Sequence, residues 1–336
     1  MRSKTTLGVF ILVAVVIVAS LAFFVTRDDG NAIPGVTVSE GDVPKITVDE
    51  PVEVETGDPK VATLKEGDGR KVAKGDYFRA NYIFADGKTG EELESSYEAP
   101  AEGTPASSRV FEMTPMDEAT SQSAPGLPGG LIDALSDTTV GSTVLVALTA
   151  EDFFGKEYYE QAEAQGALDQ VQYAKDDILL FYLDVEGSID VKADATPEGK
   201  KTKLPAGVPS PVVDGDQVTK LDGAGATEPV ADGVFPVITG DGATVEADDY
   251  VYANYVGQLY PNGEVFDSSF ERDAPALFPL TGVIPCWANE LTGQKVGSRV
   301  VLTCTSESAY GPDGGGGGTI PPNSPLTFVV DIVAVL

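Results

Sequence analysis

The chain has 336 residues, enough for two ordinary domains that each bury a core of their own. Its 53 acidic and 22 basic residues give a formal charge of -31, which repels nucleic acid phosphates and argues against nucleic-acid binding. The absence of histidine removes the usual general base of serine and cysteine hydrolases and the commonest zinc ligand, so we expect no metal and no cofactor.

The N-terminus carries an uncharged, mostly apolar run from Thr5 to Val25 behind two basic residues. As a helix this run would extend about 30 Å, which is the thickness of a bilayer core. Because positive charges favour the cytoplasmic side, the sequence predicts a signal anchor or transmembrane helix over residues 1–26, with the rest of the chain outside the cytoplasm. The alternative is a signal peptide cleaved near Ala19, which would give a secreted protein.

Two stretches are typical of linkers. Residues 27–60 combine Asp, Glu, Gly and Pro with isolated Val and Thr, and residues 189–229 place prolines among lysines and glycines. They separate two more strongly patterned blocks. We therefore predict an acidic linker at 27–60, a first domain at 61–188, a second linker at 189–229 and a second domain at 230–336.

The two blocks resemble one another, which indicates an internal repeat. Residues 76–82 return as residues 249–255 at an offset of 173, and residues 140–155 return as 296–311 at an offset of 156. The first copy therefore holds 17 additional residues between these motifs, since 173 - 156 = 17. We expect both copies to share one fold.

Each copy shows strand signals, turns and one short helix. Residues 250–259 alternate and are rich in aromatic and β-branched types, and Pro-Asn-Gly at 261–263 supplies a turn. Residues 296–305 and 326–336 have the same strand character, whereas 286–291 is long enough only for one or two helical turns. The predicted fold class is α+β, with two domains that each wrap a twisted antiparallel β-sheet around a short α-helix, after one N-terminal transmembrane helix.

Seven short motifs occur in order within the second copy. They are YVG at 255–257, GEVFDSS at 263–269, VIPCW at 283–287, VGSR at 296–299, AYG at 309–311, IPP at 320–322 and LTF at 326–328. Over about 100 residues this series resembles the FKBP family, the macrolide-binding peptidyl-prolyl isomerases. The resemblance implies two FKBP-like domains, isomerase activity in the second one, and proline-containing exported polypeptides and macrolides as ligands. The membrane would be reached only through the N-terminal helix.

The resemblance also implies an aromatic pocket with a polar rim. An X-Pro amide resists rotation by about 18–20 kcal/mol because resonance holds it planar. A dry aromatic pocket favours the twisted amide, so neither nucleophile nor metal is required. By this resemblance the catalytic residues are Tyr255, Phe266, Asp267, Trp287, Tyr310 and Phe328, and the substrate-binding residues are Arg272, Val283, Ile284, Ala309 and Ile320.

Some of these positions also have simpler interpretations. Single aromatic residues are more often core than site, Asp267 is also typical of a solvated turn, and Arg272 of an ordinary surface charge. Ala276 stands where the family often has an aromatic residue, which predicts an open wall. The five glycines at 314–318 predict a mobile flap. Both features leave macrolide binding open.

Cys286 and Cys304 are the two cysteines of the chain, and both lie in the second copy. Their counterparts in the first copy are Gly130 and Leu148, so both are absent together. This joint presence or absence favours a disulfide in an oxidising compartment. Two independent buried thiols are the alternative.

The first copy lacks most of the implied site, and we predict a degenerate domain for substrate capture, spacing or partner contact. For the whole chain we predict a catalyst of the folding of exported proteins. The alternatives are a non-catalytic, chaperone-like peptide-binding module and a structural protein of the cell envelope. In the first copy, Leu93, Glu94, Leu131 and Phe154 stand at the positions of Phe266, Asp267, Trp287 and Tyr310, whereas Tyr82 and Phe181 persist.

Overall fold

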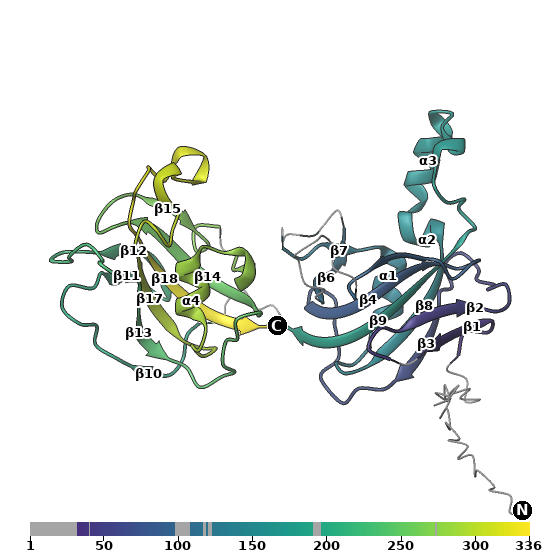
Figure 1. Ribbon diagram of the computed structural model, residues 1–336, viewed down its shortest axis with the longest axis horizontal. Helices are drawn as coiled ribbons and strands as arrows, with labels where there is room; N and C mark the ends of the chain where they lie inside the picture. The colour runs from purple at the N-terminus through teal and green to yellow at the C-terminus, as the bar shows by residue number, and fades with distance from the viewer. Residues whose placement is uncertain are drawn as a thin grey trace, which may run out of the picture.

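The structure, a computed structural model, has mixed α+β content and is dominated by two mostly antiparallel sheets of seven strands each (Figure 1). Within the residues that it describes, no helix is long and apolar enough to cross a membrane. The predicted anchor at 1–26 lies outside those residues. The described residues are 32–39, 41–97, 108–116, 119, 123–190, 196–272 and 274–336.

The first sheet and the segments that pack on it, within residues 32–190, are called the N-terminal unit. Its strand order is β3-β8-β9-β4-β6-β7, and β5 also pairs with β4. Helix α1 (Gly129–Leu135) buries Leu131, Ile132 and Leu135 against the sheet. After β8 come α2 (Ala150–Phe154), α3 (Lys156–Ala164) and the 3-10 turn η1 (Leu168–Gln170), and Figure 1 shows α3 projecting away from the sheet. The strands are β3 (Lys60–Lys65), β4 (Tyr77–Asp86), β5 (Glu92–Ser95), β6 (Arg109–Pro115), β7 (Gly126–Leu127), β8 (Thr143–Thr149) and β9 (Ile178–Ile189).

The second sheet and its attached segments, within residues 196–336, are called the C-terminal unit. Its strand order is β10-β13-β17-β18-β14-β15, and β16 also pairs with β14. Helix α4 (Pro285–Leu291) begins with a proline, which suits the first helical turn, and buries Cys286, Trp287 and Leu291. The strands are β10 (Lys200–Lys201), β13 (Gly233–Thr239), β14 (Tyr250–Leu259), β15 (Val265–Ser268), β16 (Ala276–Pro279), β17 (Arg299–Cys304) and β18 (Leu326–Val335), with 3-10 turns η2 (Leu280–Gly282), η3 (Gly311–Asp313) and η4 (Gly316–Gly318).

The two sheets share one pattern of strand pairing. Strand β4 pairs with β9, β5 and β6 in the first sheet, and β14 pairs with β18, β15 and β16 in the second. The pairs β3–β8 and β8–β9 correspond in the same way to β13–β17 and β17–β18. This agreement supports the internal repeat, and it places one apolar core between the sheet and the short helix of each unit.

The segments predicted as linkers are partly folded, so the expectation of plain spacers is wrong for these residues. Strands β1 (Val36–Ser39) and β2 (Lys45–Val48) form one hairpin within 27–60, and β11 (Ser210–Asp214) and β12 (Gln217–Asp222) form another within 189–229. Strand β10 also belongs to the second sheet although it precedes residue 230. The sequence contains too few apolar residues here to indicate a core by itself.

The two hairpins cover equivalent places on the outer faces of the two sheets. Ile46 of the first hairpin is buried in a cluster with Ile83, Leu145 and Tyr182, whereas Val218 and Leu221 of the second lie in a cluster with Val256, Val301 and Val329. The repeat offsets relate Ile83 to Val256 and Leu145 to Val301, and the strand registers relate Tyr182 to Val329. The sheet therefore supplies the apolar surface that the hairpins need, and each repeated unit extends further toward its N-terminus than the sequence repeat does.

Candidate functional site

An aromatic cluster surrounds Trp287 in the C-terminal unit. Trp287 lies in the first turn of α4 and is only 4% exposed. Its ring contacts Tyr255 at 5.6 Å, Phe278 at 5.3 Å and Phe328 at 5.4 Å between centroids, each at a steep angle. Phe266 continues the cluster at 5.8 Å from Phe328. These edge-to-face contacts are the favoured arrangement of aromatic rings, and they fix the orientation of the indole.

Phe278 occupies the wall that was expected to be open at Ala276. Strand β16 places Ala276 opposite Ala253 and Phe278 opposite Val251. Residues two apart in a strand share a face, so both side chains point into the same core. The ring of Phe278 lies 5.4 Å from Tyr255. Sequence reasoning missed this residue; the available signal was its spacing of two residues from Ala276 in an apolar run, which puts both on one face of a strand.

A polar trio lies at the edge of the aromatic cluster. The Tyr255 hydroxyl donates a hydrogen bond to Oδ2 of Asp267, and Arg272 donates from Nη1 to Oδ1 of the same carboxylate. Arg272 also donates from Nη2 to the Tyr255 hydroxyl oxygen at 2.9 Å and lies 5.7 Å above the tyrosine ring. The structure thus places Asp267 and Arg272 at the edge of the aromatic cluster, with side chains that are 40% and 50% exposed.

Burial and hydrogen bonding set the protonation of Tyr255 and Arg272. Burial, with the hydrogen bond to Asp267, raises the pKa of the Tyr255 phenol well above its usual value, so this hydroxyl stays protonated and acts as a donor. Burial lowers the pKa of Arg272, but the hydrogen bonds to Asp267 and Tyr255 outweigh this and raise it overall. Tyr255 and Arg272 therefore both act as hydrogen-bond donors at neutral pH.

The glycine loop is folded against Tyr310. Gly315 and Ile320 exchange two backbone hydrogen bonds of 3.0 and 3.1 Å, and the Ile320 side chain is 3% exposed. A Cβ at Gly315 would lie 2.5 Å from Cδ1 of Tyr310, so glycine is required for this close approach. Tyr310 is 41% exposed, and both burial and the charge of Asp267 raise its pKa. The predicted mobility of the loop stays a prediction, but in its described conformation Gly315 lies directly against the Tyr310 ring.

The predicted disulfide between Cys286 and Cys304 is confirmed. It joins the first turn of α4 to the end of β17, and both residues are fully buried, so the alternative of two independent thiols is wrong. The backbone N–H of Cys286 also donates to the carbonyl oxygen of Ser308 at 3.1 Å, next to Ala309. These links hold the helix that carries Trp287. Val283, Ile284 and Ala309 are partly buried and pack on the same core.

The indole N–H of Trp287 is the one buried side-chain polar group without a hydrogen-bond partner in the described part of the chain. An unpaired buried donor costs about 1–3 kcal/mol, so such groups are rare in folded proteins. Where they persist, they commonly mark functional sites.

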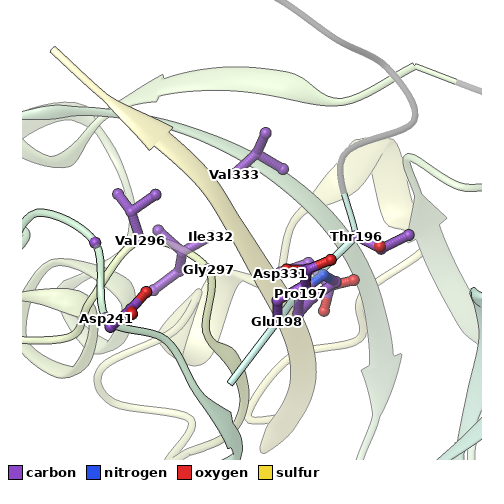
Figure 2. A pocket seen from close by; sticks show the side chains of 10 residues that line it. Thr196, Pro197, Glu198, Asp241, Val296, Gly297, Asp331, Ile332 and Val333 are labelled. Atoms are coloured by element: carbon purple, nitrogen blue, oxygen red, sulfur yellow. The ribbon is translucent and has the colours of Figure 1, made fainter.

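A separate pocket lies beside the end of β18, away from the aromatic cluster. Figure 2 shows Asp331 in its wall, and this carboxylate is already bound by Arg299 through two hydrogen bonds of 2.6 Å. Among the described residues no group of acidic or cysteine side chains is arranged to hold a metal ion. This pocket contains none of the predicted site residues, and its lining is Thr196, Pro197, Glu198, Asp241, Gly242, Val296, Gly297, Asp331, Ile332 and Val333.

The N-terminal unit contains a counterpart of the polar trio. The Tyr82 hydroxyl donates to Oε1 of Glu94 at 2.5 Å, and Arg109 donates to the same oxygen at 3.1 Å while lying 5.3 Å above the tyrosine ring. Arg109 pairs with β4 at the place where Ala276 pairs with β14. The arginine of this trio therefore comes from a different strand position than in the C-terminal unit.

The aromatic part of the N-terminal counterpart is filled by its own side chains. Phe84 stands at the position of Gly257, stacks on Phe181 at 4.6 Å and lies 5.5 Å from Phe153. A Cβ at Gly257 would lie only 2.7 Å from the ring of Phe266, so that ring needs glycine beneath it. Phe84 therefore takes the space that Phe266 uses in the C-terminal unit.

Comparison with known proteins identifies relatives of the C-terminal unit. Residues 242–333 match the profile of the FKBP-type peptidyl-prolyl cis-trans isomerases. The chain is 43% identical over 122 residues to the FKBP-type 22 kDa peptidyl-prolyl cis-trans isomerase of Escherichia coli, covering 36% of this chain and 57% of that protein. It is 41% identical over 111 residues to the FK506-binding protein of Streptomyces anulatus, covering 32% of this chain and 90% of that protein.

Among solved structures, the peptidyl-prolyl cis-trans isomerase of Pseudomonas syringae is 34% identical, with a TM-score of 0.29, and the match covers 31% of this chain and 74% of that one. The chain thus spans little more than half of the Escherichia coli relative but nearly all of the Streptomyces one. With the Streptomyces protein matched over nine tenths of its length, the chain belongs to the FKBP-type peptidyl-prolyl cis-trans isomerase family.

Proposed function

We propose that the aromatic cluster of the C-terminal unit catalyses cis-trans isomerisation of X-Pro bonds in exported polypeptides. The observation that carries this proposal is the set of three rings around Trp287 with the Tyr255, Asp267 and Arg272 trio at its edge. Macrolide ligands are proposed for the same rings, with Phe278 as the wall that Ala276 does not provide.

The chemistry follows from the electronic structure of the amide. A planar X-Pro amide is polarised by resonance, whereas the twisted amide loses that resonance and much of its charge separation. An apolar floor at Trp287 therefore favours the twisted state over the planar one. The hydroxyl of the partly exposed Tyr310 and the trio supply donors for the carbonyl group that changes direction. The lowering of the barrier comes from binding alone.

The N-terminal unit is proposed as a non-catalytic domain with the same fold. Phe84 fills the space of the aromatic site, Leu131 replaces the indole floor, and Phe154 lacks the hydroxyl of Tyr310. The division into domains at 61–188 and 230–336 is part of this proposal, and the paired hairpins add their own segments to each domain.

We also propose that the protein acts outside the cytoplasm, held at the membrane by residues 1–26. The apolar run from Thr5 to Val25 supports the anchor, and the disulfide supports an oxidising compartment. Fractionation of cells tests the anchor: the full chain should stay with the membrane fraction and should be degraded by protease added outside the cytoplasmic membrane. Protection from that protease would overturn the proposed location.

A matched pair of substitutions tests the site of catalysis in the full chain. Asp267→Ala and Glu94→Ala remove equivalent, partly exposed carboxylates from the two trios, so neither should prevent folding. We expect Asp267→Ala to lower kcat/KM in a protease-coupled assay of an X-Pro peptide by about tenfold or more, which equals about 1.4 kcal/mol. Glu94→Ala should leave it unchanged. Equal effects of the two would contradict the proposal, and an inert wild type would favour the peptide-binding module.

A further inference from the structure

The two units meet in a buried apolar cluster. It contains Tyr77 and Val110 from the N-terminal unit and Tyr252 and Leu277 from the C-terminal unit, all at most 5% exposed. The rings of Tyr77 and Tyr252 lie 5.7 Å apart, and Leu336 packs on the same cluster. Figure 1 shows this last residue of the chain between the two sheets. The junction is therefore a packed interface.

Each unit presents the same face to the other. In the N-terminal unit the contacting residues lie at the ends of β4, β6 and β9, and in the C-terminal unit at the ends of β14, β16 and β18. The strand registers show that these two sets of residues occupy equivalent positions. Contact through one shared face is the arrangement of subunits in a two-fold homodimer. We call this surface the pairing face, and its equivalent residues are Tyr77 and Tyr250, Arg79 and Tyr252, Val110 and Leu277, and Ile189 and Leu336.

Arg79 makes the two pairing faces complementary. Its Nη1 donates to the carbonyl oxygen of Leu336 at 3.4 Å, and its Nη2 lies 3.9 Å from Oδ2 of Asp248. It also bonds Ser108 and Glu186 within its own unit, which hold the side chain in place. The residue of the C-terminal unit equivalent to Arg79 is the uncharged Tyr252. The Arg79 charge therefore meets an acceptor and a carboxylate that only the C-terminal unit presents, so the two different units pair better than two copies of one unit.

Gly187 lies directly against the other unit. A Cβ at this position would meet one atom within 4 Å, Cδ2 of Leu336 at 3.2 Å. The backbone of Gly187 is outside the left-handed region, so its own conformation does not require glycine. The equivalent residue of the other sheet is Ala334. An alanine at 187 would need Leu336 to shift by a few tenths of an ångström, and a larger side chain would press on the contact between units.

We propose that the N-terminal unit is a built-in pairing partner of the C-terminal unit, bound through the pairing face as one subunit of a two-fold dimer binds the other. By covering Tyr252, Leu277 and Leu336 it stabilises the C-terminal unit. This role does not need an open proline site. It therefore accounts for an N-terminal unit that keeps the fold although Phe84 fills the space of the aromatic site. It is independent of whether the C-terminal site is catalytic.

Substitution of Gly187 by phenylalanine in the full chain tests the pairing, with Gly129→Phe as the matched control. A Cβ at Gly129 meets nothing within 4 Å. Trp287 is the single tryptophan of the chain, so its fluorescence reports on unfolding of the C-terminal unit alone. We expect Gly187→Phe to lower the urea midpoint at Trp287 and to enlarge the radius of gyration in X-ray scattering, whereas Gly129→Phe changes neither. Wild-type values for Gly187→Phe would overturn the proposal.

A double-mutant cycle at the facing tyrosines gives an independent measurement. Tyr77→Ser changes the stability of its own unit, but only a contact between units can pass that change to Trp287 in the other unit. We expect Tyr77→Ser to lower the midpoint read at Trp287, and this shift to disappear in a Tyr252→Ser background. An equal shift in both backgrounds would contradict the pairing.

Discussion

Replacing Gly257 by alanine should damage the aromatic site while the fold persists. The new Cβ would lie 2.7 Å from Cε2 and Cζ of Phe266 and 2.9 Å from Cε1 of Phe328, where ordinary contact begins at 3.4 Å. Phe266 must therefore move by about 0.7 Å, the difference between 3.4 and 2.7 Å, or rotate away from Phe328. The backbone at Gly257 is outside the left-handed region, so overlap alone produces the effect.

The expected magnitude follows from this overlap. Overpacking of a buried site costs about 1–3 kcal/mol of the free energy of unfolding. A displacement of about 1 Å in an active site can lower turnover about 100-fold. Because the shift of Phe266 is somewhat smaller, we expect kcat/KM for an X-Pro peptide to fall by about 10- to 100-fold, with the fold retained at 25 °C.

A protease-coupled assay measures the change in kcat/KM, and urea unfolding followed at Trp287 measures the change in stability of the same unit. Gly129→Ala in the N-terminal unit is the control, because its new Cβ meets nothing within 4 Å. If Gly257→Ala keeps the wild-type kcat/KM, then the position of Phe266 over Phe328 is not needed for catalysis and the reasoning is refuted.

Trp287→Phe removes the unpaired indole N–H, and losing this unsatisfied donor stabilises the fold by about 1–3 kcal/mol, which offsets a packing loss of about 1 kcal/mol. Thermal unfolding followed by circular dichroism should therefore show retained stability, while the coupled assay shows lower activity. Cys286→Ala with Cys304→Ala opens a loop of 18 residues and should lower the free energy of unfolding by about 3 kcal/mol, and reductant should have no further effect on that variant. Arg299→Met leaves the buried Asp331 without its partner and should cost about 3–5 kcal/mol at pH 7. Burial already raises the Asp331 pKa, so this deficit should shrink as pH falls and the carboxyl binds a proton, which urea midpoints at several pH values will show.

Sequence alone indicated an internal repeat, and it identified the family and most of the aromatic residues. These conclusions needed only residue types in order, because the same residues return at offsets of 173 and 156. The disulfide could also be predicted from the sequence, since both cysteines are missing together from the first copy. The anchor at 1–26 stays a prediction, because those residues lie outside the described part.

Contacts between residues far apart in the chain were decided only by the tertiary structure. Phe278 closes the wall that was expected to be open at Ala276, because the two residues share one face of strand β16. Phe84 closes the first site because the register sets it beside Phe181, as it sets Gly257 beside Phe328.

The hairpins and the pairing face were also decided only by the tertiary structure. Each uses a few apolar residues whose local pattern indicates a spacer or a surface strand, and they become buried when a second element covers them. Residue order determined which side chains each unit carries. Packing determined which of them form an accessible site, which fill it, and which join the two units, since burial depends on neighbours that local periodicity does not encode.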